Sequence, residues 1–173
     1  MTSSLTLSTA RLMLQMPTPD DLGAYRTFYA ASDLTVGGYR GGRSEEEISA
    51  ILRRDLDHWA TRGFGIWLLR PIGGAQVLGG CGLAHPDNWP RHELTWWLMP
   101  EARGKGYATE ASRAVISWAH DKLGWDRVET HMRDENTPAR RIAIRLGGRR
   151  ICRETFPDGV TRDVFELPKA GAG

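Results

Sequence analysis

The chain contains 173 residues, of which 40% are hydrophobic, and its formal net charge at pH 7 is only +2. A chain of this length can bury the core of one globular domain, and its near neutrality argues against a nucleic-acid-binding protein. It contains neither an apolar run of the roughly 18 residues that span a membrane nor a basic segment leading into an apolar run at the start. We therefore expect a cytoplasmic protein with one domain over residues 1–168 and a tail over 169–173.

The first 62 residues are predicted to form a strand, two helices and a loop. Apolar residues alternate with polar ones in the strand. Asp20 and Asp21 place negative charge in the first turn of the first helix, where the helix dipole favours it. Ser44 and Glu47 have the spacing of a capping box at the start of the second helix. These elements are the strand 10–16, the helix 20–32, the glycine-rich loop 36–43 and the helix 44–61.

Strands and helices then follow one another to the end of the chain. Glycines within the strand 76–84 favour a bulge or the close approach of another backbone, and Asp158 and Gly159 are typical of a hairpin turn. A strand, a helix and a second strand form a right-handed parallel unit, so the strands 93–99 and 127–133 are expected to be parallel neighbours. The fold class is therefore α/β or α+β, with a mixed sheet. The predicted elements are the strands 64–70, 76–84, 93–99, 127–133, 148–155 and 161–167, and the helices 107–123 and 137–146.

The turn 103–106 joins one of these strands to a helix. A turn of small residues that opens a helix directs several backbone N–H groups at one point, where the positive end of the helix dipole adds to them. Gly104 and Gly106 suit such a turn because a Cβ would block a ligand from approaching closely, and because glycine accommodates φ > 0. The sequence therefore predicts a site for an anion, most simply a phosphate.

This turn fits neither a Walker P-loop nor a Rossmann fingerprint. Its residues lack the GxxxxGK[ST] spacing of the first motif, and Thr109 stands at the last glycine or alanine position of the second. They do fit the pattern RxxGxA, from Arg103 to Ala108. Here the chain resembles the GNAT superfamily of N-acetyltransferases, in the branch of the ribosomal-protein alanine N-acetyltransferases. The resemblance runs from about residue 9 to 167 and rests on TARLML, RGFGIWLL, GGCGL, ELTWWLMPEARGKGYATEA, and Asn136 leading to LGG.

The resemblance implies a fold and a co-substrate. The fold is a mostly antiparallel sheet with a V-shaped splay between its fourth and fifth strands, flanked by the four predicted helices. Acetyl-CoA, with no metal, would lie in the V, its pantetheine paired with the backbone and its pyrophosphate at the turn. Asn136 would contact the pantetheine or adenylate arm. Arg140 or Arg145 would meet the 3′-phosphate, unless these arginines only form a solvated helix face. The residues implied to bind acetyl-CoA are Leu98, Met99, Arg103, Gly104, Lys105, Gly106, Tyr107, Ala108, Thr109, Asn136, Arg140 and Arg145.

Acetyl transfer to an amine requires an uncharged amine, and hence a base. Glu93 is the candidate, because it begins the strand that leads to the implied thioester site and matches the acidic position of the family. The two-residue period of a strand places Glu93, Thr95 and Trp97 on one face. The alternative is that Glu93 only pairs with Arg91 or Lys105 at the surface.

The general acid is not identified by the resemblance. Ala139 and Ala143 stand where related proteins carry a serine and a tyrosine. Tyr39, Tyr107, a serine or a water would then protonate the leaving thiolate, unless the step needs little help.

Other side chains are given simpler roles. His131, on a predicted strand, is expected to pack or to lie at the surface, and the histidine spacings suit no metal site. Cys81 and Cys152 are expected to be reduced, packed thiols, although Cys81 as a nucleophile is an alternative. The acceptor cleft is expected to include Tyr39, Trp67, Trp89 and Trp97.

The predicted activity is transfer of an acetyl group from acetyl-CoA to a primary amine by direct attack in a ternary complex. The acceptor is a protein N-terminus or a small molecule, and homodimers are common in families of this kind. One alternative is a non-catalytic acyl-CoA-binding or sensor protein, favoured by the two missing hydroxyl groups. Another is a nucleic-acid module built on the arginines of the C-terminal third.

Overall fold

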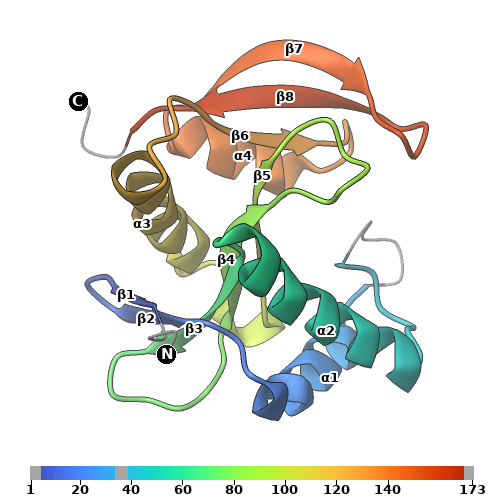
Figure 1. The fold of residues 1–173 in the computed structure, drawn as a ribbon, viewed down its shortest axis with the longest axis vertical. Helices are drawn as coiled ribbons and strands as arrows, with labels where there is room; N and C mark the ends of the chain where they lie inside the picture. Colours follow the sequence, from blue (N-terminus) through green and yellow to red (C-terminus); the bar gives the residue numbers. More distant parts are fainter. Residues whose placement is uncertain (1–4, 34–38, 170–173) are drawn as a thin grey trace.

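The computed structural model describes residues 5–33 and 39–169, so part of the predicted loop (34–38) and most of the predicted tail (170–173) lie outside the described residues. Lys169, the first residue of that tail, forms an ion pair with Asp121 at 2.9 Å. The described helices and strands follow the order shown in Figure 1. They are β1 (Thr6–Ser8), β2 (Leu12–Gln15), η1 (Pro19–Asp21), α1 (Leu22–Ala31), α2 (Glu45–Arg62), β3 (Ile66–Pro71), β4 (Gly79–Ala84), β5 (Glu93–Leu98), η3 (Pro100–Ala102), α3 (Tyr107–Lys122), β6 (Val128–Met132), α4 (Thr137–Arg145), β7 (Arg149–Thr155) and β8 (Thr161–Leu167).

Local signals set the ends of the first two helices. Ser44 and Glu47 form the predicted capping box at α2, and Gly63 ends this helix with a φ of 76°. The first α-helix begins later than predicted because Thr18 caps a 3₁₀ turn, η1, that precedes it. The short strand β1 pairs antiparallel with β2. The sequence does not predict β1, since three residues are too few to show a period.

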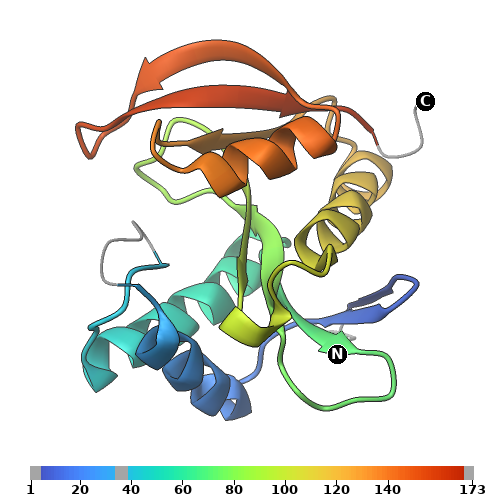
Figure 2. The same cartoon turned by 180° about the vertical axis from the view of Figure 1, so that it is seen from behind.

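The strands form two antiparallel sheets. The order is β1-β2-β3-β4-β5 in the first and β6-β8-β7 in the second. The strands 93–99 and 127–133, expected to be parallel neighbours, are in contact as β5 and β6 but form no ladder among the described residues. On its other edge β6 pairs antiparallel with β8, from Val128 opposite Leu167 to Met132 opposite Asp163. Figures 1 and 2 show that β5, the last strand of the larger sheet, diverges from β6, which is the splay expected between these two strands.

The glycines of β4 allow neighbouring strands to approach closely, as predicted. A Cβ built on Gly82 would overlap the carbonyl oxygen of Gly65, and one on Gly79 would overlap that of Trp97. Only glycine leaves the backbone free to come so near without a shift of the adjacent strand. These contacts hold β3, β4 and β5 together where β5 leads toward the turn 103–106.

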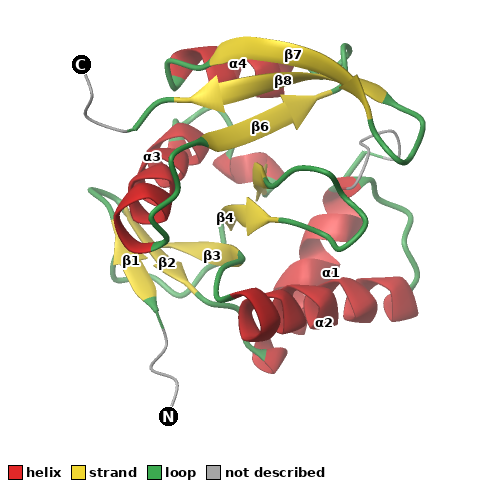
Figure 3. Ribbon diagram, turned by 45° about the horizontal axis from the view of Figure 1, so that its top comes forward, coloured by secondary structure: helices red, strands yellow, loops and turns green. Residues whose placement is uncertain are grey.

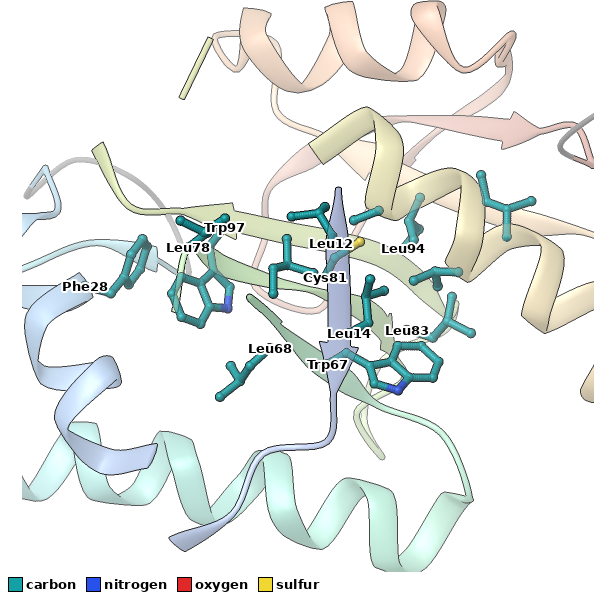
Figure 4. Packing of buried hydrophobic residues seen from close by; sticks show 14 of the residues in the cluster. Leu12, Leu14, Phe28, Trp67, Leu68, Leu78, Cys81, Leu83, Leu94 and Trp97 are labelled. Carbon is teal, nitrogen blue, oxygen red and sulfur yellow. The ribbon is translucent and has the colours of Figure 1, made fainter. Parts of the chain in front are cut away.

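Helices cover the five-stranded sheet from different sides. α3 packs against β4 and β5, while α1 and α2 pack against each other away from α3 (Figure 3). None of the helices formed by the described residues is long and apolar enough to cross a membrane. Figure 4 shows buried side chains between these layers. Those with no exposed surface include Leu12, Leu14, Trp67, Leu68, Leu69, Cys81, Leu83 and Leu94.

Candidate active site

The turn between β5 and α3 has the backbone geometry that its glycines suggest. Gly104 and Gly106 have φ angles of 75° and 82°, in the left-handed region that favours glycine. Residues 103–106 are exposed. Gly106 is the N-cap of α3, and no side-chain cap hydrogen bond is formed there within the described part of the chain. The first N–H groups of this 16-residue helix are therefore available to an anion at the positive end of the helix dipole.

A surface groove of about 540 Å³ lies beside this turn. Gly106, Thr109 and Arg113 contribute from α3 and its N-cap, Arg11 from the segment between β1 and β2, and Arg145 from the end of α4. The structure thus brings two of the predicted side chains, Thr109 and Arg145, to the turn. Arg11 forms an ion pair at 2.7 Å with Glu110, which lines the same groove. The charges of Arg113 and Arg145 therefore suit an anionic ligand.

Two other residues of the predicted cofactor set are engaged elsewhere. Asn136 caps α4, because its side-chain oxygen accepts a hydrogen bond from the backbone N–H of Ala139 at 3.3 Å. Arg140 forms an ion pair with Asp163 at 2.9 Å. Neither Asn136 nor Arg140 lines the groove beside the turn. Of the two arginines predicted for a terminal phosphate, Arg145 is therefore the one at the groove.

The backbone N–H and carbonyl groups of β5 point alternately to β4 and to the opposite edge of the strand. Met99 donates its N–H to the carbonyl of Leu78 at 2.8 Å, and the turn η3 takes up its carbonyl. The N–H of Met99 is therefore engaged within the protein, and the pairing of Met99 with a cofactor stays a prediction. Because successive residues of an antiparallel ladder point in opposite directions, the N–H of Leu98 points away from β4, to the side of β6. The carbonyl of Leu94 does the same, since it accepts a hydrogen bond from Thr130 Oγ1 at 2.9 Å.

Glu93 lies at the start of β5, beside a histidine of β6. Its side chain is 27% exposed, and its Oε2 lies 3.3 Å from His131 Nδ1. Burial raises the pKa of Glu93 to about 8, although Arg162 acts in the opposite direction. Arg91 does not pair with Glu93, because it binds Glu129 at 2.7 Å instead. The structure therefore places at this point a carboxyl group with a pKa near the operating range of a general base.

His131 is the neighbour of Glu93 that sequence reasoning missed. Only 8% of the residue is exposed, which agrees with the packing role predicted for it. Its place beside Glu93 depends on how β5 and β6 meet, and no local pattern encodes that contact. The residue type alone was the available signal.

Tyr39 lies on the same face of β5 as Glu93. Its hydroxyl is hydrogen-bonded to Thr95 Oγ1 at 2.7 Å, and its ring packs edge-on against Phe28. Burial raises the pKa of Tyr39 above its ordinary value, and the charge of Glu93 raises it further. Tyr39 thus keeps its proton and presents a hydroxyl group close to the candidate base.

The tryptophans predicted for the acceptor cleft take different places. Trp67 has no exposed surface, and its ring lies between Trp59 and Trp118 at centroid distances of 4.8 and 4.9 Å. Both faces of β3 are buried, so the prediction that Trp67 lines the cleft is wrong. Trp97 is 6% exposed and packs against Phe28 at 4.4 Å, beside which it lies in Figure 4. It supports the aromatic layer under Tyr39.

The structure gives little support to two alternatives, a Cys81 nucleophile and a nucleic-acid site built on the arginines of the C-terminal third. Cys81 is a fully buried free thiol, as predicted, and burial raises its pKa to about 12, so it is not a ready nucleophile. The arginines of the C-terminal third are largely paired rather than free. Arg140, Arg150 and Arg153 all converge on Asp163, at 2.9, 3.4 and 3.1 Å.

Comparisons with known proteins identify the family of the chain. The chain matches the family model described as an acetyltransferase (GNAT) domain over residues 11–149. The uncharacterized N-acetyltransferase YnaD of Bacillus subtilis is 30% identical over 59 residues, which are 34% of this chain and 35% of that protein. The match thus spans about a third of this curated relative.

Solved structures extend the likeness to nearly the whole chain. An acetyltransferase from Agrobacterium tumefaciens is 27% identical with a TM-score of 0.85, over 97% of this chain and 96% of that one. RimL, a ribosomal L7/L12 α-N-protein acetyltransferase in complex with coenzyme A, is 14% identical with a TM-score of 0.74, over 98% and 100% of the two chains. The second likeness concerns the fold alone. Since the family model covers most of its length, the chain belongs to the acetyltransferase (GNAT) family.

Proposed function

We propose that this protein transfers the acetyl group of acetyl-CoA to a primary amine, by direct attack of the amine in a ternary complex. One observation carries the proposal: a partly buried carboxyl group and a helix start without a side-chain cap lie at the two ends of one strand. Glu93, whose pKa burial raises to about 8, begins β5, and the uncapped turn with Gly104 and Gly106 follows the end of that strand. Acyl transfer from a phosphate-bearing thioester to an amine requires both, at a fixed separation.

The chain offers three kinds of group to acetyl-CoA. The backbone N–H groups at the start of α3 suit the pyrophosphate. Arg145 and Arg113 lie in the adjoining groove, where their charge suits the terminal phosphate. The N–H of Leu98, on the side of β6, suits a carbonyl of the pantetheine arm. The presence of coenzyme A in the RimL structure supports this assignment for a protein of the same fold.

Glu93 is proposed as the general base. An α-amino group has a pKa of about 7.7–8.0, whereas that of a lysine side chain is about 10.4. A carboxylate with a pKa of about 8 accepts a proton from an α-ammonium at almost no cost, but from a lysine only against a difference of about two pH units. The site is therefore better matched to a protein or peptide N-terminus than to an alkylamine.

Tyr39 is proposed as the proton donor to the leaving thiolate. The positions at which related proteins carry hydroxyl groups are Ala139 and Ala143, and Ala143 is fully buried. The hydroxyl of Tyr39 is hydrogen-bonded to Thr95 Oγ1 at 2.7 Å, which holds it on the face of Glu93. This side chain can supply the hydroxyl that α4 lacks.

The decisive experiment is a free-thiol assay with acetyl-CoA and a panel of peptides with free N-termini, alkylamines and aminoglycosides. We expect thiol release with at least one peptide, and a large loss of rate in Glu93→Gln that is greatest at and above about pH 8, where the wild-type carboxyl is ionised and can act as a base. Tyr39→Phe should lower the rate without weakening acetyl-CoA binding. Tight acetyl-CoA binding with no thiol release across the panel would instead identify a non-catalytic acyl-CoA-binding protein.

A further inference from the structure

His131 combines burial, a fixed tautomer and a free polar atom beside Glu93. Trp89 donates its indole N–H to His131 Nε2 at 3.4 Å, so Nε2 is the acceptor and the proton of the neutral ring resides on Nδ1. Nδ1 lies 3.3 Å from Glu93 Oε2. The two atoms are not aligned as a hydrogen bond, and Nδ1 has no other partner among the described residues. A buried donor without an acceptor is costly and calls for an explanation.

The ring is held so that this donor keeps its direction. Phe156 stacks on it at a centroid distance of 4.4 Å, and Trp89 lies on it at 6.4 Å. Burial lowers the pKa of His131 to about 3, with Arg162 and Arg91 acting in the same direction and Asp158 opposing them. The 3.3 Å contact is therefore not an ion pair, since the ring is neutral at physiological pH. It brings a neutral ring nitrogen that carries a proton to 3.3 Å from a carboxyl oxygen.

We infer that His131 is a positioning residue for Glu93: its Nδ1–H orients the carboxylate of Glu93 toward the acceptor amine and favours its charged form. A hydrogen bond from Nδ1–H to Glu93 is stronger when the carboxylate is ionised. The inference rests on the proposed function, in which Glu93 is the base.

Several charged and titratable groups surround Glu93 and His131, and they decide which group a titration near neutral pH follows. Arg162 of β8 acts on Glu93 and on His131 alike, and Tyr39 is close enough to Glu93 for its own pKa to respond. On the side of His131 the further groups are Arg91, His92 and Asp158. His92 has a pKa of about 4 because of burial, so it is neutral alongside His131 near neutrality. A titration near pH 8 therefore reports Glu93.

The inference is tested first without any reaction. In a ¹⁵N spectrum of the unmodified full chain, the ring of His131 should show a proton on Nδ1 and none on Nε2. The Glu93 carboxyl, followed by ¹³C NMR, should titrate about one pH unit higher in His131→Phe than in the wild type, because one hydrogen bond to the charged form is lost. His131→Asn, whose side-chain N–H reaches the position of Nδ1, should restore most of that difference.

The same variants are then compared in the thiol-release assay with the best peptide. His131→Phe should move the acidic limb of the kcat/KM profile upward by about one pH unit, which is a loss of about tenfold below that limb. His120→Phe is the matched control. His120 is also a partly buried histidine, bonded to the carbonyl of Trp125 at the far end of α3, and its replacement should leave the limb in place.

Failure of the inference differs from failure of the proposed function. If the proton resides on Nε2, or if Glu93 titrates at the same pH in wild type and His131→Phe, the inference is overturned even in an active enzyme. If Glu93→Gln is as fast as the wild type at and above about pH 8, Glu93 is not the base and the proposed function fails first. In the Glu93→Gln background, His131→Phe should cause no further change in the pH profile, and a further shift would also overturn the inference.

Discussion

Replacing Glu93 with glutamine should make the protein more stable at alkaline pH, although it removes the proposed base. The folded protein holds the proton of Glu93 up to a pKa of about 8, compared with 4.5 for an ordinary glutamate. Because the folded pKa is the higher one, the stability that this group contributes is fully present below about pH 4.5. It is lost as the pH rises toward 8. Glutamine does not titrate, so the variant keeps its stability over the same range.

The magnitude follows from the two pKa values. Their difference corresponds to roughly 5 kcal/mol. The side chain is 27% exposed, and water near the carboxylate reduces the cost of ionising it, so we expect roughly half of that amount. The free energy of unfolding of Glu93→Gln, relative to wild type, should therefore rise by roughly 2 kcal/mol between about pH 5 and pH 9.

Urea unfolding followed by tryptophan fluorescence measures this difference directly. Wild type and Glu93→Gln are unfolded at about pH 5, 7 and 9, and the free energies are extrapolated to water. Glu135→Gln, at an exposed position, is the matched control and should follow the wild type throughout. A difference between Glu93→Gln and wild type that stays constant with pH would refute the reasoning. It would mean that Glu93 ionises as easily in the folded protein as in the unfolded chain.

Other substitutions test the turn, the strand contact and the arginine cluster. Gly106→Val should weaken acetyl-CoA binding at least about tenfold in calorimetry, because valine is strained at a φ of 82°. Gly124→Val imposes similar strain at the other end of α3 (φ of 69°) and should leave the affinity unchanged; equal losses would remove the turn from the cofactor site. Gly82→Ala should lower the free energy of unfolding by roughly 3 kcal/mol, since its Cβ would overlap the backbone of Gly65, and a neutral result would contradict the close packing of β3 and β4. Asp163→Asn should cost about 3 kcal/mol in the same measurement, because three arginines converge on a carboxylate that is 5% exposed; an unchanged midpoint would mean that these ion pairs contribute nothing.

The features that the sequence predicts well are determined by residues only a few positions apart. The capping box of Ser44 and Glu47 depends on groups three residues apart, and the structure contains it. The left-handed turn at Gly104 and Gly106 is encoded in the same way, because few residues other than glycine adopt that conformation. The order of helices and strands follows from hydrophobic periods and turn residues, which are equally local.

The features that the sequence does not predict depend on contacts between distant segments. The splay of β5 from β6 is one such feature, because it depends on how two strands of different sheets meet. The engagement of the Met99 N–H depends on the register between β4 and β5. Trp67 lies in a strand with both faces buried, so alternation cannot tell an inner face from a cleft. The partnership of Glu93 and His131 joins residues 38 positions apart, and the tautomer of His131 depends on Trp89, in the loop before β5.

The divergence of β5 from β6 also has a consequence for the protein in solution. It leaves backbone groups on one edge of β5, including the N–H of Leu98, without a ladder partner among the described strands. An open strand edge pairs with any extended chain that reaches it, including another copy of the same protein. Coenzyme A bound along that edge would cover it and stabilise the folded state by mass action. Without coenzyme A the protein should therefore aggregate more readily than with it, and added coenzyme A should slow aggregation during storage.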